Sequence, residues 1–220
     1  MLQKFTTFEI LTYLLLATRW TIILSLIAFI GGGIVGLIIA ILRVLPSRAL
    51  NYVSSAYIQF IQGTPLLMQL FLTFFGLAIL GLDVSAWMAA AVALIGFTSA
   101  FLGEIWRGCI QAIPKPQWEA AASLGLGLFQ QMRYVIFPQA FKISIPPTVG
   151  FLVQVIKGTS LASVIGFIEL SRAATAINNV TFKPFLVFSM VGCIYFSLCY
   201  PLSVLSRRME RKLNVAARSH

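Results

Sequence analysis

Long uncharged stretches, separated by short polar segments, dominate the chain. The first runs from Trp20 to Leu42 and the last from Pro184 to Ser206, and each is long enough to cross a membrane, which takes about 20 mostly apolar residues in a helix. No charged residue lies between Arg48 and Asp83. The polar cluster Gln59–Pro65 interrupts that stretch, so the pattern predicts a second span with a kinked start. We leave open whether the segment before the first span is an interfacial helix or an extension of that span.

Two further spans are predicted in the middle of the chain. One covers about Ser85 to Gly103, and the other begins at Thr148. The latter is interrupted at Lys157–Ser160 before apolar sequence resumes at Leu161–Ile168. An irregular polar segment at membrane depth is tolerated only where it is buried or lines a cavity. We therefore expect about five spans with a broken fourth helix beside a cavity, and two spans in place of the fourth as the alternative.

Composition excludes a soluble protein. Hydrophobic residues make up 59% of the 220 residues and charged residues only 10%, and mean hydropathy is +0.93. This length suits a handful of spans, so we expect one transmembrane domain over residues 1–220, all α-helical. The three cysteines lack the spacing of metal ligands, and we expect no metal site.

Charge sets the expected orientation. Lys and Arg number 16 against 6 Asp and Glu, a net charge of +10, but they lie between or beyond the apolar runs. Contact with lipid headgroups and the usual excess of basic residues in cytoplasmic loops explain these Lys and Arg residues better than nucleic-acid binding does. The basic tail at Arg207–Lys212 is then cytoplasmic, and five spans place the N-terminus outside.

One polar connection carries a recognisable motif. Residues Trp118–Gly125 read Trp-Glu-Ala-Ala-Ala-Ser-Leu-Gly, and Pro138 follows. This spacing resembles the EAA loop of ABC importer permeases. The resemblance implies a type I importer permease fold, with residues 115–140 forming the loop whose coupling helix docks on an ATPase. Alanine favours a helix, Gly125 allows a turn, and Glu119 is expected near the helix start, where its charge suits the dipole. The expected coupling residues are Glu119, Ala120, Ala121, Leu124 and Gly125; an ordinary amphipathic connecting helix is the alternative.

Three other segments narrow the resemblance to the polar amino-acid uptake permeases, which are similar to histidine, glutamine and arginine permeases. They are Gly63–Leu67, Glu104–Gly108 and Lys157–Leu161. The chain departs from the pattern at Gln62, where arginine is usual, and at Gly158, where several relatives have aspartate. The missing carboxylate makes a basic substrate less favoured, or means that this subunit does not hold the substrate.

The polar interruptions are the expected substrate path. Thr159 and Ser160 can hydrogen-bond a zwitterion, and Lys157 can attract a carboxylate or instead extend to the membrane surface. Glu104 and Arg107, three apart on one helix face, are expected to form a structural ion pair. The expected path residues are Lys157, Gly158, Thr159, Ser160, Gln62, Thr64 and Pro65.

The chain has no G-x-x-x-x-G-K-[ST] motif, so we expect no catalytic residue and no cofactor here, with ATP and Mg²⁺ held by a partner. The resemblance implies an inner-membrane subunit that works with an ABC ATPase dimer, a second permease subunit and an extracytoplasmic amino-acid binding protein.

One rival function is an ion-driven secondary transporter, which needs carboxylates within its spans, and only Glu104 lies near such a depth. The other rival, a membrane scaffold for an ATPase, leaves the polar break at Lys157–Ser160 unexplained. The amino acid carried and the identity of the second subunit stay open.

Overall fold

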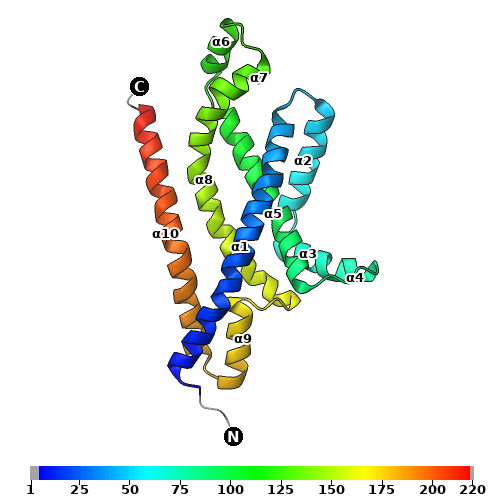
Figure 1. The fold of residues 1–220 in the computed structure, drawn as a ribbon, viewed down its shortest axis with the longest axis vertical. Coiled ribbons are helices and arrows are strands. Elements are labelled where there is room, and N and C mark those ends of the chain that lie inside the picture. Colours follow the sequence, from blue (N-terminus) through cyan, green and yellow to red (C-terminus); the bar gives the residue numbers. More distant parts are fainter. Residues whose placement is uncertain (1–4, 219–220) are drawn as a thin grey trace.

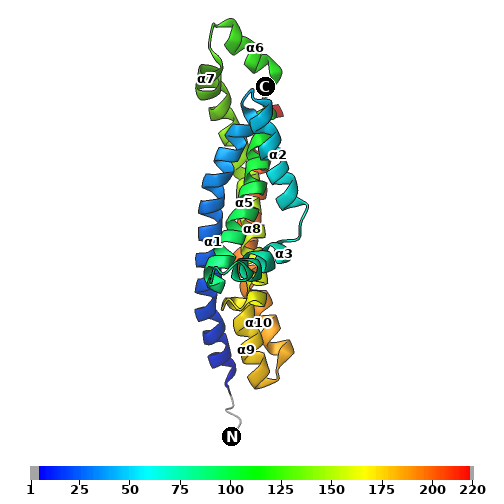
Figure 2. The same cartoon turned by 90° about the vertical axis from the view of Figure 1, so that its right-hand side faces the viewer.

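The structure, a computed structural model, describes residues 5–218, and every regular element in that range is a helix. Long helices run roughly side by side, with the N-terminus at one end and the C-terminus at the other (Figure 1), and the view turned by 90° is equally elongated (Figure 2). The predicted all-α class is confirmed. The elements are α1 (Thr7–Val44), α2 (Arg48–Gln62), α3 (Leu66–Phe71), the π-helical turn η1 (Leu72–Gly76), α4 (Leu77–Ile79), α5 (Ala86–Gln111), α6 (Lys115–Ser123), α7 (Leu128–Gln131), the π-helical turn η2 (Met132–Ile136), α8 (Phe137–Gly158), the 3-10 helix η3 (Thr159–Ile165), α9 (Leu170–Thr181) and α10 (Pro184–Arg218).

Four helical stretches of the described chain are long and apolar enough to cross a membrane. They are α1, α5, Leu128–Ile165 and Pro184–Leu213, and the bent pair of α2 with Leu66–Ile79 makes a fifth if it counts as one span. The prediction of about five spans is confirmed in this sense. Because Leu128–Ile165 stays helical throughout, the alternative that divides this region into two spans is wrong.

Helix α1 decides the role of the first apolar segment. It runs unbroken for 38 residues, and the Thr6 hydroxyl caps it by accepting a hydrogen bond from the Glu9 backbone N–H at 3.3 Å. The Glu9 carboxylate accepts from the Thr6 backbone N–H at 2.7 Å, which completes a capping box. The segment before Trp20 is therefore an extension of the first span and not an interfacial helix.

Small residues let α1 and α5 approach closely. A Cβ atom added to Gly32 would lie 2.4 Å from Thr98 Cβ, and one added to Gly36 would lie 2.9 Å from the Ser99 carbonyl oxygen. These distances leave no room for a side chain at either glycine. The small-residue spacing of the first span thus builds the main helix pair of the fold.

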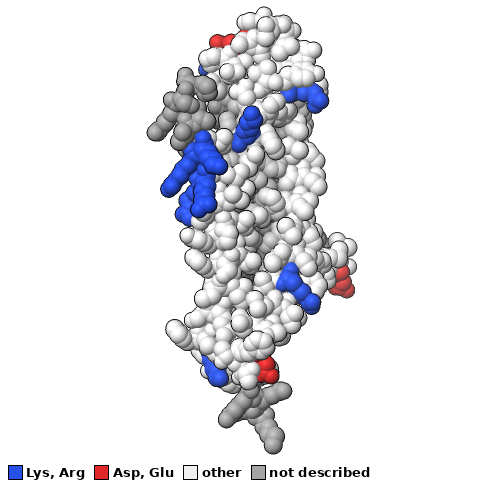
Figure 3. All heavy atoms as spheres, turned by 60° about the vertical axis from the view of Figure 1, so that its left-hand side comes forward, with Lys and Arg blue, Asp and Glu red and all other residues white. Residues whose placement is uncertain are grey.

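Charged side chains are distributed unevenly along the molecule. On the face drawn in Figure 3, most Lys and Arg side chains gather toward the end that carries α6 and the C-terminal part of α10. The N-terminus and α9 lie at the opposite end (Figure 1). The two ends of the molecule therefore differ in charge, as expected for a protein with a fixed orientation in a membrane.

Candidate functional site

The candidate coupling helix is α6, which projects with α7 from one end of the molecule (Figure 1). Pro114 precedes α6 and Pro116 lies in its first turn, while Gly125 takes a left-handed conformation, with a φ of 74°, just after its end. Because α6 begins at Lys115, Glu119 lies in the middle of the helix, and no acidic residue lies in its first turn. The expectation that Glu119 suits the helix dipole near the start is therefore wrong.

The predicted coupling residues fall on two faces of α6. Glu119, Ala120 and Gly125 are exposed, and Leu124 is 78% exposed. Ala121, in contrast, is only 2% exposed. Ala121 therefore helps to seat α6 on the rest of the chain and does not face a partner in this conformation.

Two contacts hold the loop on the helices that carry it. Trp118 packs against a small buried cluster that includes Ile113 and Ile136. Gln139 of α8 donates a hydrogen bond from Nε2 to Oε1 of Gln117 at 3.3 Å. A force applied to α6 can thus reach both α5 and α8.

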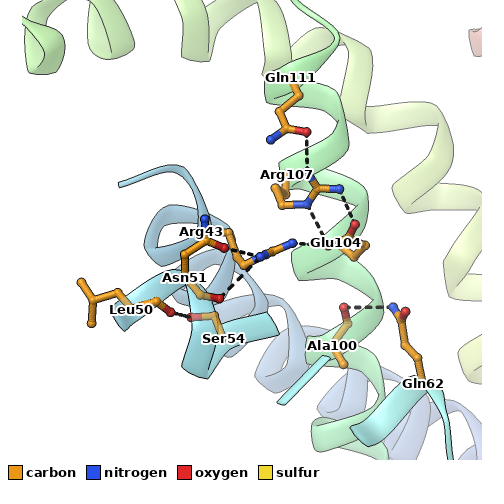
Figure 4. Close-up of polar contacts among 9 residues, drawn as sticks. All are labelled: Arg43, Leu50, Asn51, Ser54, Gln62, Ala100, Glu104, Arg107 and Gln111. Atoms are coloured by element: carbon orange, nitrogen blue, oxygen red, sulfur yellow. Dashed lines mark hydrogen bonds and ion pairs between the residues drawn. The ribbon is translucent and has the colours of Figure 1, made fainter. Parts of the chain in front are cut away.

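A charged cluster lies where α1, α2 and α5 meet at this end (Figure 4). Arg107 donates from Nε to Glu104 Oε2 at 2.8 Å and makes a second bond to Glu104 Oε1. Arg43, at the end of α1, approaches Glu104 Oε2 at 3.9 Å and also donates to the Asn51 side chain of α2. Arg107 also bonds Gln111, in the last turn of α5 before α6. The cluster therefore links the base of the coupling loop to two other helices.

The polar cluster of the second apolar stretch forms a corner. Helix α2 and the stretch Leu66–Ile79 meet at an angle of 101°, so the predicted kink is a sharp bend. Gln69 holds this corner, because its Nε2 donates to the Ile61 carbonyl at 2.8 Å, to the Thr64 carbonyl at 3.1 Å and to the Thr64 hydroxyl at 3.0 Å. Among the described residues, the exposed Gln62 makes a single long side-chain bond, to the Ala100 carbonyl at 3.5 Å. The corner is thus fixed by a residue outside the expected path set.

A groove of about 280 Å³ opens beside this corner, between α2, the α3–η1 segment and α5. Its lining is mostly apolar, with polar groups from Tyr57, Thr64, Gln69 and Thr73. The Gln69 Oε1 atom is buried and has no hydrogen-bond partner among the described residues. One buried acceptor thus borders a largely apolar groove.

The interruption in the fourth span is a change of helix type and not a break. The chain passes from α8 into the 3-10 helix η3 at Thr159. The Thr159 hydroxyl is buried and donates to the Ile156 carbonyl at 2.7 Å, and the Ser160 hydroxyl donates to the Lys157 carbonyl at 2.6 Å. Both hydroxyls are occupied within their own helix. The expectation that the helix is broken here is therefore wrong, and in this conformation each hydroxyl donates its proton within its own helix, which leaves only its oxygen lone pairs for a ligand.

Comparison with known proteins places the chain in one family. The family model described as binding-protein-dependent transport system inner membrane component matches residues 32–215, which is most of the chain. The chain belongs to this family of permeases. The resemblance inferred from its motifs is confirmed.

The permease has relatives of nearly equal length. It is 34% identical over 207 residues to a probable amino-acid ABC transporter permease protein of Bacillus subtilis strain 168, covering 93% of this chain and 90% of the relative. It is 35% identical over 193 residues to a probable glutamine ABC transporter permease protein of the same organism, covering 88% and 89%. A solved amino acid ABC transporter with histidines matches with a TM-score of 0.87 at 36% identity, over 91% of this chain and 94% of that chain. The type I importer permease fold is thus confirmed.

In the permease, parts of the two candidate path segments come together. A Cβ atom added to Gly158 would lie 3.1 Å from Leu66 Cδ2, at the start of α3 directly after Pro65. The exposed Lys157 lies near Cys199 of α10. The structure therefore brings Gly158 to the corner and places Lys157 near α10.

Sequence reasoning missed several residues of these sites. Arg43 and Asn51 enter the charged cluster from other helices, and Gln69 lies within an apolar run with no local signal. Within residues 5–218 no group of three or more His, Cys, Asp or Glu side chains is placed to hold a metal ion. These polar contacts join residues of different helices, so they can be recognised only in the folded permease.

Proposed function

We propose that the permease carries an amino acid across the cytoplasmic membrane as the membrane subunit of an ATP-driven importer. The supporting observation is the tip of the loop formed by α6 and α7. Leu124 and Phe129 are each 78% exposed there, next to the exposed Glu119. Large apolar side chains outside the membrane favour a protein partner, which we take to be the ATPase. ATP and Mg²⁺ are bound by that ATPase.

Coupling follows from the way the loop is mounted. Helix α6 follows directly on α5, and η2 connects α7 to α8. Movement of α6 on nucleotide binding shifts α5 and α8, and α8 ends at Gly158, beside Leu66 at the corner. The substrate path lies at this junction and opens outward to receive the amino acid, and ATP hydrolysis returns it to the inward state. The names of the relatives support an amino acid as substrate.

The charge distribution supports the orientation. The end with α6 and the basic part of α10 is cytoplasmic, so the C-terminus lies inside. The N-terminus and α9 then lie outside, where an amino-acid binding protein delivers the substrate. The family description, which names dependence on a binding protein, supports this partner. A second permease subunit, the same or similar, completes the path.

The test is uptake of labelled amino acids into vesicles that contain the permease with its co-purified partners. We compare the wild type with Glu119→Lys, which reverses a charge in the middle of α6. Glu210→Lys is the matched control, because it makes the same change at an exposed site on α10, at the same end of the molecule.

We expect uptake that requires ATP and a binding protein, that collapses with Glu119→Lys and that persists with Glu210→Lys. Uptake driven by an ion gradient and unaffected by Glu119→Lys would favour a secondary transporter. ATPase binding without uptake of any amino acid would favour a membrane scaffold.

A further inference from the structure

A carboxylate is fully buried at the end of the molecule opposite α6. Glu169 has an exposed fraction of 0% and precedes α9 as its N-cap residue. Oε1 accepts a hydrogen bond from the Arg172 backbone N–H at 2.9 Å. Oε2 accepts from the Tyr195 hydroxyl of α10 at 2.9 Å and from the Thr21 hydroxyl of α1 at 3.4 Å. One side chain thus caps α9 and bonds two other helices.

The partners of Glu169 reinforce one another. The Thr21 hydroxyl also accepts from the Leu170 backbone N–H at 3.2 Å, and the Tyr195 hydroxyl lies 3.1 Å from the Ser171 hydroxyl. Both α1 and α10 are therefore bonded to the first turn of α9. Removing Glu169 alone leaves Tyr195 without its carboxylate partner.

Within the part of the chain that the structure describes, no cation forms an ion pair with this carboxylate. The ion pairs found among the described residues both belong to Glu104, and Glu169 is not part of either. Burial of an unpaired carboxylate is costly, and three hydrogen bonds offset only part of that cost. A helix cap alone does not need such burial, because exposed Asp or Ser caps serve as well. The position of Glu169 therefore indicates a role beyond capping.

The segment that Glu169 anchors connects the candidate path to α9. Phe167 packs into the main hydrophobic core, with its ring centroid 5.1 Å from that of Trp87. Helix α9 packs against α1, α10 and η3. The short chain between η3 and α9 is thus held at Phe167 and again at Glu169, so that η3 and α9 have to move together.

We propose that Glu169 is a positioning residue that holds α9 and η3 as one unit against α1 and α10, so that events at the end opposite α6 reach the candidate path at Gly158. This inference rests on the proposed function, in which that end faces the binding protein. Docking of the binding protein displaces α9, and the short chain that the bonds of Glu169 hold in place between η3 and α9 transmits the displacement to η3. Without these bonds α9 shifts alone, and stimulation of the ATPase by the binding protein is lost.

The test distinguishes the role of Glu169 as the N-cap of α9 from its role in the hydrogen bonds to α1 and α10. Glu169→Asp retains a good N-cap residue but has a shorter side chain, which cannot keep the bonds to Tyr195 and Thr21. Tyr195→Phe and Thr21→Val remove those partners one at a time and leave Glu169 in place. Tyr200→Phe is the matched control, because Tyr200 is half-exposed on the same helix and has no hydrogen bond among the described residues.

The measurement uses the reconstituted complex with the binding protein and labelled amino acid that support wild-type uptake. We record basal ATPase activity, its stimulation by the binding protein, and melting temperature. We expect Glu169→Asp and Tyr195→Phe to keep basal activity and to lower stimulation about tenfold, within the usual range of coupling between sites. Thr21→Val lowers the stimulation less, because the bond from Thr21 to Glu169 is longer than the bond from Tyr195. Tyr200→Phe leaves the stimulation unchanged.

Each other outcome has a defined meaning. A lower melting temperature with unchanged stimulation in both Glu169→Asp and Tyr195→Phe overturns the inference and leaves Glu169 a structural residue. If Glu169→Asp does not assemble, Tyr195→Phe decides alone, since it removes a single hydroxyl. If the wild type itself shows no uptake or stimulation, it is the proposed function that fails.

Discussion

Arg43 Nη2, at the end of α1, lies 3.9 Å from Oε2 of Glu104 on α5, the same oxygen that accepts a hydrogen bond from Arg107. Two arginines thus share one carboxylate. The side chains are 17% exposed for Arg43, 19% for Arg107 and 33% for Glu104. The carboxylate holds together two cations that would otherwise repel each other at the base of the coupling loop.

Loss of the Glu104 charge is therefore expected to destabilise the permease. Glu104→Gln leaves two partly buried arginines without an anion, and we expect a cost of about 1–2 kcal/mol, below that of a fully buried pair. The melting temperature in detergent measures it. Adding Arg43→Gln is expected to recover part of the loss, because it removes the repulsion. Purely additive effects of the two changes would show that Arg43 and Glu104 do not interact.

Close packing of α1 on α5 gives a second prediction. Gly36→Ala places a methyl group 2.9 Å from the Ser99 carbonyl oxygen, and we expect a loss of about 1–3 kcal/mol from overpacking. Gly33→Ala is the control on the same helix, because its methyl group meets Trp106 only at 3.7 Å. Unfolding in a mixed detergent compares the two variants. If Gly36→Ala and Gly33→Ala were equally stable, α1 and α5 could move apart at Gly36 at little cost.

The corner between α2 and α3 should depend on Gln69. Gln69→Leu keeps the size of the side chain but removes its three hydrogen bonds to Ile61 and Thr64. We expect the corner to lose its fixed angle, since the Ile61 and Thr64 carbonyls lose the shared side-chain donor that ties α2 to α3. Spin labels on α2 and α3 report this as a broader distance distribution. Gln59→Leu, an exposed site on α2, should leave the distribution narrow.

Substrate charge preference should depend on Gly158. Gly158→Asp introduces a carboxylate beside Leu66, at the junction of the two candidate path segments. We expect uptake of a basic amino acid to rise about tenfold relative to a neutral one, because an opposite charge nearby stabilises the cation. Competition between labelled arginine and glutamine measures the ratio. Gly158→Asn has the same size without the charge, and an equal shift with Asn would show that shape and not charge sets the preference.

Local properties of the chain were enough to predict its class. The uncharged runs that became α1 and α10 must be helices in a membrane, because only a helix satisfies its own backbone within one apolar segment. The family motif around Glu119 was equally local, and so was Gly125, whose left-handed conformation ends the loop helix. The start of α6 was misplaced, although Pro116 in its first turn was a visible signal.

The arrangement of the polar sites depended on contacts between distant parts of the chain. Arg43 meets Glu104, and Tyr195 meets Glu169, only because the helices that carry them pack side by side. No pattern within one segment reports which polar side chain of another segment will lie opposite it. Hydrophobicity and periodicity therefore determined which segments enter the membrane. Helix packing determined which buried polar groups find partners, because hydrogen bonds and ion pairs require atoms to lie within a few ångströms of each other.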